Sequence, residues 1–455
     1  MTVGASLTRV EDLQTQIRQG AVSVTQLVEV ALDRIHDPAG QGESTFITTF
    51  DEEALALAQQ QNQELAKGHP LQALTGVTVS VKDLFDTQGH TTTSGSLVLR
   101  QNPPATKDAE VIDRLRQAGA IVVGRTTMTE FAYSGLGLNP HYGTPLNPFE
   151  RDIGRIPGGS TSGGVISVTD GMATIAMGSD TGGSCRIPAA LCGVVGFKST
   201  AARYSQEGVL PLSHSLDSVG FLAPSVACCI AVDQVLAKEE YWQKEVAIDP
   251  TLQIGVLQNV VLEGLDADVK SHFERSLQIL QAKGAHLHQV HSMAIDRVIE
   301  IQGQPRIVAA QAHAQFEEIL NTQSEQMDPR IASRIIKGKD VSSAIYIRTM
   351  QEREQLIAAW QQEFAGDAVW IMPTVPIIAP RLSELEQDDA YFRINALMLR
   401  NPGLFNFLDG CAISIPNHQL GHAPTGLMLV APAGHDQQLL AIARLIEQQF
   451  ATSLF

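Results

Sequence analysis

The 455-residue chain has few basic residues, few cysteines and no long apolar run. It has 32 Lys and Arg residues against 49 Asp and Glu residues, and the formal net charge of −17 argues against direct binding to nucleic acid or to an anionic membrane. No run of 18 apolar residues is present, which argues against a transmembrane helix. Because the N-terminus has neither a basic start nor an apolar segment, we expect no signal peptide and a cytoplasmic protein.

Cysteine and histidine offer little for a metal or redox site. The cysteines contain no C-x-x-C pair, and their odd number favours free, buried thiols at Cys185, Cys192, Cys228, Cys229 and Cys411. The group His286, His288 and His291 has no cysteine or carboxylate nearby in sequence to complete a zinc site, so an exposed strand edge is the preferred interpretation. We therefore predict no metal and no cofactor.

The chain does have a large apolar fraction, 44%, with only 18% charged residues, and this composition is sufficient for a large core. Residues 1–70 show the apolar periodicity of helices. From Gly76 the period changes to two, and a helical pattern over 108–119 and a second strand pattern at 121–123 indicate a βαβ unit with parallel strands. The alternation resumes in the second half without a linker or a repeat. We predict one α/β domain over residues 1–455, with the N-terminal helices packed on its core.

Residues 154–221 are rich in Gly, Ser and Thr but contain short apolar runs, so a flexible linker is excluded. Gly193–Ser199 lacks the glycine spacing and the Gly-Lys pair of a phosphate-binding loop, and no serine in the stretch fits a G-x-S-x-G nucleophile elbow. Ser184 follows two glycines, between a predicted strand end and a predicted helix start. It is either a capping serine in a tight turn or a nucleophile beside backbone amides that can stabilise an oxyanion.

Lys82 is unusual because it lies in an apolar strand pattern between Val77 and Leu84. A lysine buried in such a strand is either paired with an anion or has a lowered pKa. Asp83 is a candidate partner, although adjacent residues on a strand point to opposite faces.

Several motifs in a fixed order resemble the amidase signature family. They are G-G-S-T-S-G-G from Gly158, D-T-G-G-S-C-R-I-P-A from Asp180, C-G-V-V-G-F-K from Cys192 and S-L-D-S-V-G from Ser215, and the strand around Lys82 resembles the lysine strand of the family. The likeness covers most of the chain. It departs from the common pattern at Leu84, Thr161 and Ser199, where asparagine, serine and proline are usual. The resemblance implies a large mixed, mostly parallel, twisted β-sheet covered by helices on both faces.

The resemblance also implies a Ser–cis-Ser–Lys triad. Ser184 matches the nucleophile, Ser160 matches the bridging serine after a cis peptide, and Lys82 matches the base. The oxyanion hole of the family matches the backbone amides of Thr181, Gly182 and Gly183. Since a serine hydroxyl needs a base, these roles agree with the chemistry. We expect Ser184 to be acylated by a small carboxylic amide, with release of ammonia or amine, and the acyl-enzyme to be hydrolysed by water.

The substrate and the partners are less defined. Tyr133 and residues 389–409 are candidates to line the acyl pocket, with core packing as the alternative, and Arg186 could meet an acidic substrate or form a structural ion pair. We predict a free-standing amidase on a small-molecule amide, with no direct nucleic-acid or membrane partner, and we leave a homodimer open. The alternatives are a glutamine-hydrolysing subunit of a tRNA-dependent amidotransferase, which needs further partner proteins, and a non-catalytic binding protein.

Overall fold

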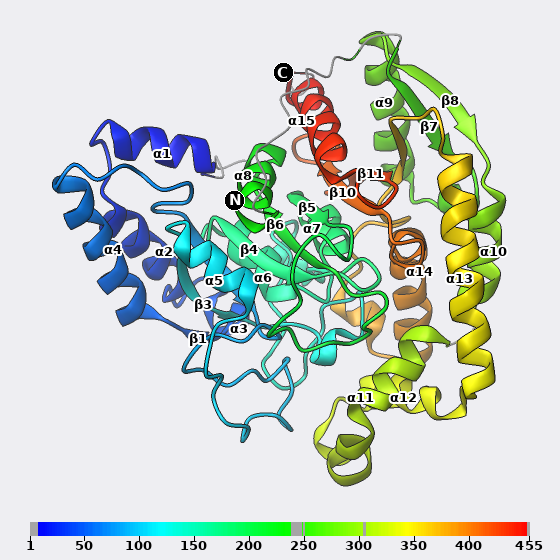
Figure 1. Cartoon of the computed structure of the whole chain (residues 1–455), viewed down its shortest axis with the longest axis horizontal. Helices are drawn as coiled ribbons and strands as arrows, with labels where there is room; N and C mark the ends of the chain where they lie inside the picture. Colours follow the sequence, from blue (N-terminus) through cyan, green and yellow to red (C-terminus); the bar gives the residue numbers. More distant parts are fainter. Residues whose placement is uncertain (1–7, 238–247, 249–250, 304–305, 453–455) are drawn as a thin grey trace.

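The computed structural model describes residues 8–237, 248, 251–303 and 306–452. Eleven strands in this part of the chain form one sheet, in the order β1-β3-β2-β4-β6-β5-β10-β11-β9-β7-β8 (Figure 1). The strands are β1 (Phe46–Thr49), β2 (Thr78–Lys82), β3 (Ile121–Thr126), β4 (Ile175–Ser179), β5 (Val195–Lys198), β6 (Val219–Ala223), β7 (Gln253–Leu257), β8 (His286–Val290), β9 (Val369–Pro373), β10 (Cys411–Pro416) and β11 (Gly426–Ala431).

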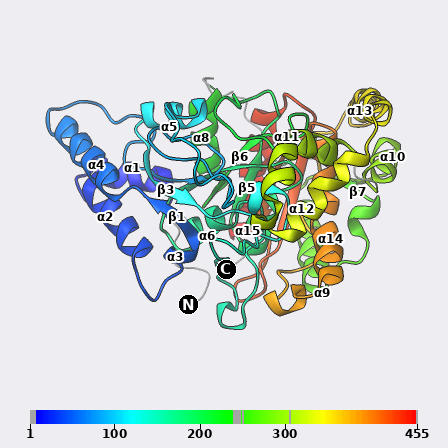
Figure 2. The ribbon, with the colours of Figure 1, turned by 90° about the horizontal axis from the view of Figure 1, so that it is seen from below.

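The described α-helices surround the sheet (Figure 2). They are α1 (Val10–Arg18), α2 (Val24–Ile35), α3 (Gly42–Thr45), α4 (Asp51–Ala66), α5 (Glu110–Gln117), α6 (Ser162–Thr169), α7 (Arg186–Cys192), α8 (Val226–Ala237), α9 (Ala267–Ala282), α10 (Met293–Gln302), α11 (Ile307–Gln323), α12 (Pro329–Ile335), α13 (Ser343–Glu363), α14 (Asp388–Phe407) and α15 (Asp436–Thr452). No helix in the ranges given above is long and apolar enough to cross a bilayer.

The sheet is mixed, as predicted, and the βαβ unit is present, because β2 and β3 pair in parallel on either side of α5. The expected parallel majority is wrong. Four of the ten pairings between described strands are parallel, and six are antiparallel. The reason lies in the connections: no helix separates β5 from β6 or β10 from β11. A strand that returns without a crossover helix pairs in the antiparallel direction.

Helices cover both faces of the sheet, as the alternating residues of β4 show. Ile175 and Met177 belong to the large core that also contains side chains of α5, α8 and α15. Ala176, between them, packs with Val165 of α6 and Ala189 of α7. Successive residues of a strand point to opposite faces, so these two helix groups lie on opposite sides of the sheet.

The N-terminal helices pack at the β1 end of the sheet (Figure 1, left). Val24 and Val28 of α2 and Ala58 of α4 form a cluster with Ile121 and Val123 of β3. In the described residues, α2 and α4 thus pack against β3 of the sheet. The extent of the domain stays a prediction, although strands from all parts of the described chain join one sheet.

Two parallel neighbours, β2 and β4, bring the predicted site residues together. Lys82 is the last residue of β2 and Ser179 is the last residue of β4. Because the two strands are parallel and adjacent, their carboxyl ends lie at the same edge of the sheet. Helix α6 begins two residues after Ser160, and α7 begins two residues after Ser184. All five cysteines are buried and free, as predicted.

Candidate active site

The Lys82 amine is completely buried at the end of β2 and contacts two serines. Its Nζ lies 2.7 Å from Ser160 Oγ and 2.9 Å from Ser179 Oγ, and it donates a longer hydrogen bond to Ser179 O at 3.4 Å. The peptide bond between Gly159 and Ser160 is cis. The structure thus places two of the predicted residues in contact. It adds Ser179, for which the sequence suggested no role even though it stands directly before the D-T-G-G-S motif.

Burial lowers the pKa of Lys82 to about 8, although Cys185, Asp180 and Asp217 act in the opposite direction. Asp83 does not pair with Lys82. Its carboxylate instead accepts hydrogen bonds from Arg125 Nε at 2.8 Å and from the hydroxyl of Thr93. Of the two possibilities raised by the sequence, the lowered pKa is therefore the one that the structure supports. At pH 8 about half of the Lys82 amine is neutral and has a lone pair for proton transfer.

Ser184 lies on the loop that leads from β4 into α7, and only 3% of it is exposed. The N–H of Thr161 donates to Ser184 O at 3.3 Å, so the loop that contains Ser160 and the loop that contains Ser184 are directly joined. Among the described contacts, no hydrogen bond connects the Ser160 and Ser184 hydroxyls.

The backbone amides before Ser184 are not equivalent. Gly183 N–H donates to Asp180 Oδ1 at 2.8 Å. Within residues 8–237, where this loop lies, the amides of Thr181, Gly182 and Ser184 donate no hydrogen bond. The free amides that could receive an oxyanion therefore include two of the three predicted ones, and the third is already used. Gly183 has φ +128°, and a Cβ there would lie 2.7 Å from Pro402 Cγ, so only glycine fits.

Arg186 forms a structural ion pair, which is one of the two roles that the sequence suggested for it. Its side chain is completely buried, and Nη2 lies 2.8 Å from Asp180 Oδ1. All five guanidinium N–H groups have acceptors: both carboxylate oxygens of Asp180, Asn406 Oδ1, Pro402 O and Met428 Sδ. Burial raises the pKa of Asp180, but the charge and hydrogen bonds of Arg186, together with Lys198 and Asn406, outweigh this effect and hold the pKa well below its usual range. No donor of Arg186 is left for a substrate, so the suggested contact with an acidic substrate is not supported.

The family model for amidases matches residues 26–440. The chain belongs to the amidase family. It is 33% identical to a 2-amino-5-chloromuconic acid deaminase from Comamonas testosteroni, over 84% of this chain and 83% of the relative. It is 29% identical to a glutamyl-tRNA(Gln) amidotransferase subunit of Syntrophus aciditrophicus (strain SB), over 96% of each chain. A crystal structure of an amidase superposes with a TM-score of 0.87 at 29% identity, covering 97% of this chain and 100% of that one.

These comparisons confirm the resemblance that was drawn from the motifs. They also show that this member of the amidase family is a hydrolase of C–N amide bonds, on the same large mixed sheet flanked by helices. The roles of individual residues stay predictions, and so does the cytoplasmic location.

Tyr133 is 7% exposed and belongs to the main core cluster. The guanidinium carbon of Arg334, on α12, lies 4.4 Å from the centre of its ring, and burial raises the pKa of the phenol. Packing, the alternative to a pocket role, accounts for these contacts. Helix α14 covers most of the other suggested segment, residues 389–409, and borders the loop of residues 181–184, because a Cβ on Gly182 would lie 3.4 Å from Leu399. Nothing in the local sequence distinguishes Arg334, which contacts the Tyr133 ring, from the other arginines.

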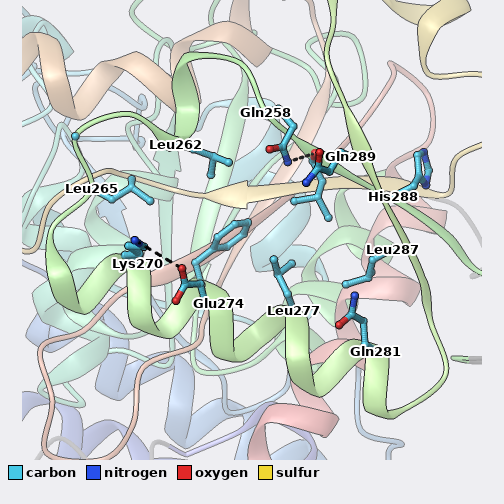
Figure 3. Close-up of a pocket in the computed structure, with 13 residues that line it drawn as sticks. Gln258, Leu262, Leu265, Lys270, Glu274, Leu277, Gln281, Leu287, His288 and Gln289 are labelled. Atoms are coloured by element: carbon cyan, nitrogen blue, oxygen red, sulfur yellow. Dashed lines mark hydrogen bonds and ion pairs between the residues drawn. The ribbon is translucent and has the colours of Figure 1, made fainter.

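Two cavities differ in their relation to this site. A cavity of about 10 Å³, room for about one water molecule, is bordered by Ser179, Thr181 and Asp217. A larger cavity of about 650 Å³ lies between α9 and the strands β7 and β8 (Figure 3). Phe273 and Leu277 give it an apolar wall. None of the predicted site residues lines the larger cavity, so it is separate from the chemistry described above.

Proposed function

We propose that the chain hydrolyses a small carboxylic amide through an acyl-enzyme on Ser184. The observation that carries the proposal is the buried Lys82 amine, 2.7 Å from Ser160 Oγ, at the edge where the Ser184 loop also lies. A lysine with a pKa of about 8 can serve as a general base near neutral pH, and a serine nucleophile requires such a base.

The contacts of Lys82 suggest how the proton moves. A neutral amine has two N–H groups and one lone pair. The two N–H groups can donate to Ser179 Oγ and Ser179 O, which leaves the lone pair directed toward Ser160. Ser160 then gives its proton to Lys82 while it accepts the proton of Ser184. Ser184 must turn toward Ser160 for this step, and catalytic hydrogen bonds often tighten only when substrate binds.

In the acylation step, Ser184 Oγ forms a bond to the carbonyl carbon, and the free amides of Thr181 and Gly182 stabilise the resulting oxyanion. The proton held by Lys82 returns through Ser160 to the leaving nitrogen, the C–N bond breaks, and ammonia or an amine departs. A water molecule then loses a proton along the same route and attacks the ester. Its oxygen forms the carboxylic acid, and Ser184 recovers its proton.

Covalent labelling tests this proposal. A fluorophosphonate should add once to the wild-type chain, and digestion should place the added mass on the peptide that contains Ser184. The Ser184→Ala variant should remain unlabelled. Labelling of a different residue, or amide hydrolysis by Ser184→Ala at the wild-type rate, would contradict the proposal.

The substrate can be sought with an amide panel scored by ammonia release. The panel should contain glutamine, aliphatic, aryl and urea-like amides. Because one relative is named as a deaminase of 2-amino-5-chloromuconic acid, the panel should also contain that acid and acidic amides.

A second candidate function is the glutamine-hydrolysing component of a tRNA-dependent amidotransferase. The 29% identity to the Syntrophus amidotransferase chain, over 96% of each sequence, favours it. Glutamine hydrolysis that appears only when co-purified partner proteins are present would select this function. Hydrolysis of another amide by the isolated chain would select the free-standing amidase.

A further inference from the structure

We propose that Asp217 is a positioning residue for this reaction. Asp217 holds Thr181, the first residue of the proposed oxyanion loop (residues 181–184), and places a negative charge near Lys82. The inference rests on the proposed function. Asp217 belongs to the S-L-D-S-V-G motif, to which neither the sequence nor the proposed mechanism has given a task.

The Asp217 carboxylate connects two segments with both of its oxygens. Oδ1 accepts a hydrogen bond from Thr181 Oγ1 at 2.5 Å, and Oδ2 accepts the N–H groups of Leu212 and Ser213 at 2.9 Å each. Only 7% of Asp217 is exposed, and burial raises the pKa of its carboxyl group. The three hydrogen bonds and the nearby Lys82 oppose this rise, because all of them favour the ionised carboxylate.

The same two segments are also joined through their backbones. Asp180 N–H donates to Ser218 O at 2.8 Å, and Ser218 N–H donates to Asp180 O at 3.2 Å. These bonds fix the residue before Thr181 but not its side chain. The hydrogen bond from the Thr181 hydroxyl to Asp217 therefore fixes the orientation of Thr181. The unpaired N–H of Thr181 is one of the two amides assigned to the oxyanion. An amide that is misplaced there loses much of its effect, because oxyanion stabilisation depends on donors that are oriented in advance.

Asp217 also differs from the other acidic groups that act on Lys82, which are Cys185 and Asp180. Asp180 also raises the pKa of Lys82, but its carboxylate is paired with the Arg186 guanidinium. Burial raises the pKa of the Cys185 thiol to about 12, so this group is uncharged at neutral pH. Asp217 borders the same small cavity as Ser179, whose hydroxyl lies 2.9 Å from Lys82 Nζ. The described partners of the Asp217 carboxylate include no arginine, and its charge favours the protonated amine. Removing the charge should lower the pKa of Lys82.

The Asp217→Asn variant tests both effects. The acidic limb of the profile of kcat/KM against pH should move to lower pH. The kcat should fall by about 10- to 100-fold, which is less than the fall expected when a whole oxyanion donor is removed, and KM should change little. Asp170→Asn is the matched control, because Asp170 pairs with Arg151 and is not among the groups that act on Lys82. The control should leave the limb in place. A folded Asp217→Asn enzyme with an unmoved limb would overturn the inference, since a merely structural role predicts that result.

The hydrogen bond can be tested without changing the charge. Thr181→Val should lower kcat by about tenfold or more and leave the acidic limb where it is, whereas Thr181→Ser, which keeps the hydroxyl, should restore most of the loss. If Asp217→Asn does not fold, the comparison of Thr181→Val with Thr181→Ser tests the inference instead. A Thr181→Val enzyme with unchanged kcat then overturns it. Failure of the wild-type chain to be labelled on Ser184 would instead refute the proposed function itself.

Discussion

Two lysines of this chain are equally buried but have different surroundings. Lys82 ends β2 and Lys198 ends β5, and burial lowers the pKa of both amines. Lys82 Nζ is near the hydroxyls of Ser160 and Ser179. Lys198 Nζ donates instead to two backbone carbonyls, Ser199 O and Gly410 O, at 2.8 Å each.

The difference shows that partners, rather than burial, separate a candidate base from a structural cation. A carbonyl oxygen only accepts hydrogen bonds, so neither of these two partners can give a proton to Lys198. A hydroxyl both donates and accepts, so Ser160 can deliver a proton to Lys82. The following variants test this distinction.

Replacement of Ser184 removes the proposed nucleophile, and no such hydroxyl lies among the described hydrogen-bond partners of Lys198. We expect Ser184→Ala to lower kcat by about 10³-fold or more, because the covalent step is lost, with an unchanged thermal midpoint. Steady-state ammonia release and a melting curve measure the two quantities. Activity within tenfold of wild type would remove Ser184 from the account.

Replacement of Lys82 should affect activity without costing stability. Lys82→Met removes the base, and we expect a loss of about 10³-fold in kcat, nearly as large as for Ser184→Ala. The folded state should be as stable as wild type or more so, because an apolar side chain replaces a buried ionisable group whose closest partners, the Ser160 and Ser179 hydroxyls, can reorient. A clear fall in the thermal midpoint with activity retained would place Lys82 in the structural class with Lys198.

Replacement of Ser179 should sharpen the picture of how Lys82 is held. In Ser179→Ala the amine loses the hydroxyl at 2.9 Å, and we expect a loss of about tenfold in kcat. An acceptor stabilises the ammonium form more than the amine, so the acidic limb should also move to lower pH. Ser179→Thr keeps the hydroxyl and should recover most of the rate. If alanine and threonine behave alike, the hydroxyl has no part in positioning Lys82.

Replacement of Lys198 should give the smallest effect on turnover. Lys198→Met leaves Ser199 O and Gly410 O without their donor, and we expect a loss of stability of about 1–3 kcal/mol. The kcat should stay within about threefold of wild type, because Lys198 touches neither serine of the proposed relay. Denaturant unfolding measures the stability and the ammonia assay measures kcat. A loss of activity comparable with that of Lys82→Met would contradict the purely structural role of Lys198.

The sequence predicted much of the fold because its patterns are local. The β2-α5-β3 unit followed from a change of apolar period, and the mixed sheet followed from the family motifs. The antiparallel majority could not be seen, since strand direction depends on how the chain returns between β5 and β6 and between β10 and β11.

The candidate site was predictable only in part, for a similar reason. Lys82 and Ser160 are 78 positions apart and were linked by family motifs alone. Ser179 contacts Lys82 between neighbouring strands, and Asp217 contacts Thr181 between two loops. A single sequence has no periodicity that marks such contacts. A structural ion pair was one of two interpretations of Arg186, but its partner, and the acceptors of all five of its N–H groups, could be known only from the packing of α14 and β11 around it.

Whether Lys82 is the base of the reaction depends on its protonation state, which can be measured. The protein can be labelled with ¹³C at the lysine Cε positions and titrated by NMR, with the Lys82 signal assigned by its absence in Lys82→Met. If Lys82 is the base, the midpoint should be about 8, and the rate of Ser184 acylation should rise as the pH increases through this value and the amine becomes neutral. A midpoint at the ordinary lysine value of 10.5, with acylation already maximal below pH 8, would contradict the claim that Lys82 is the base.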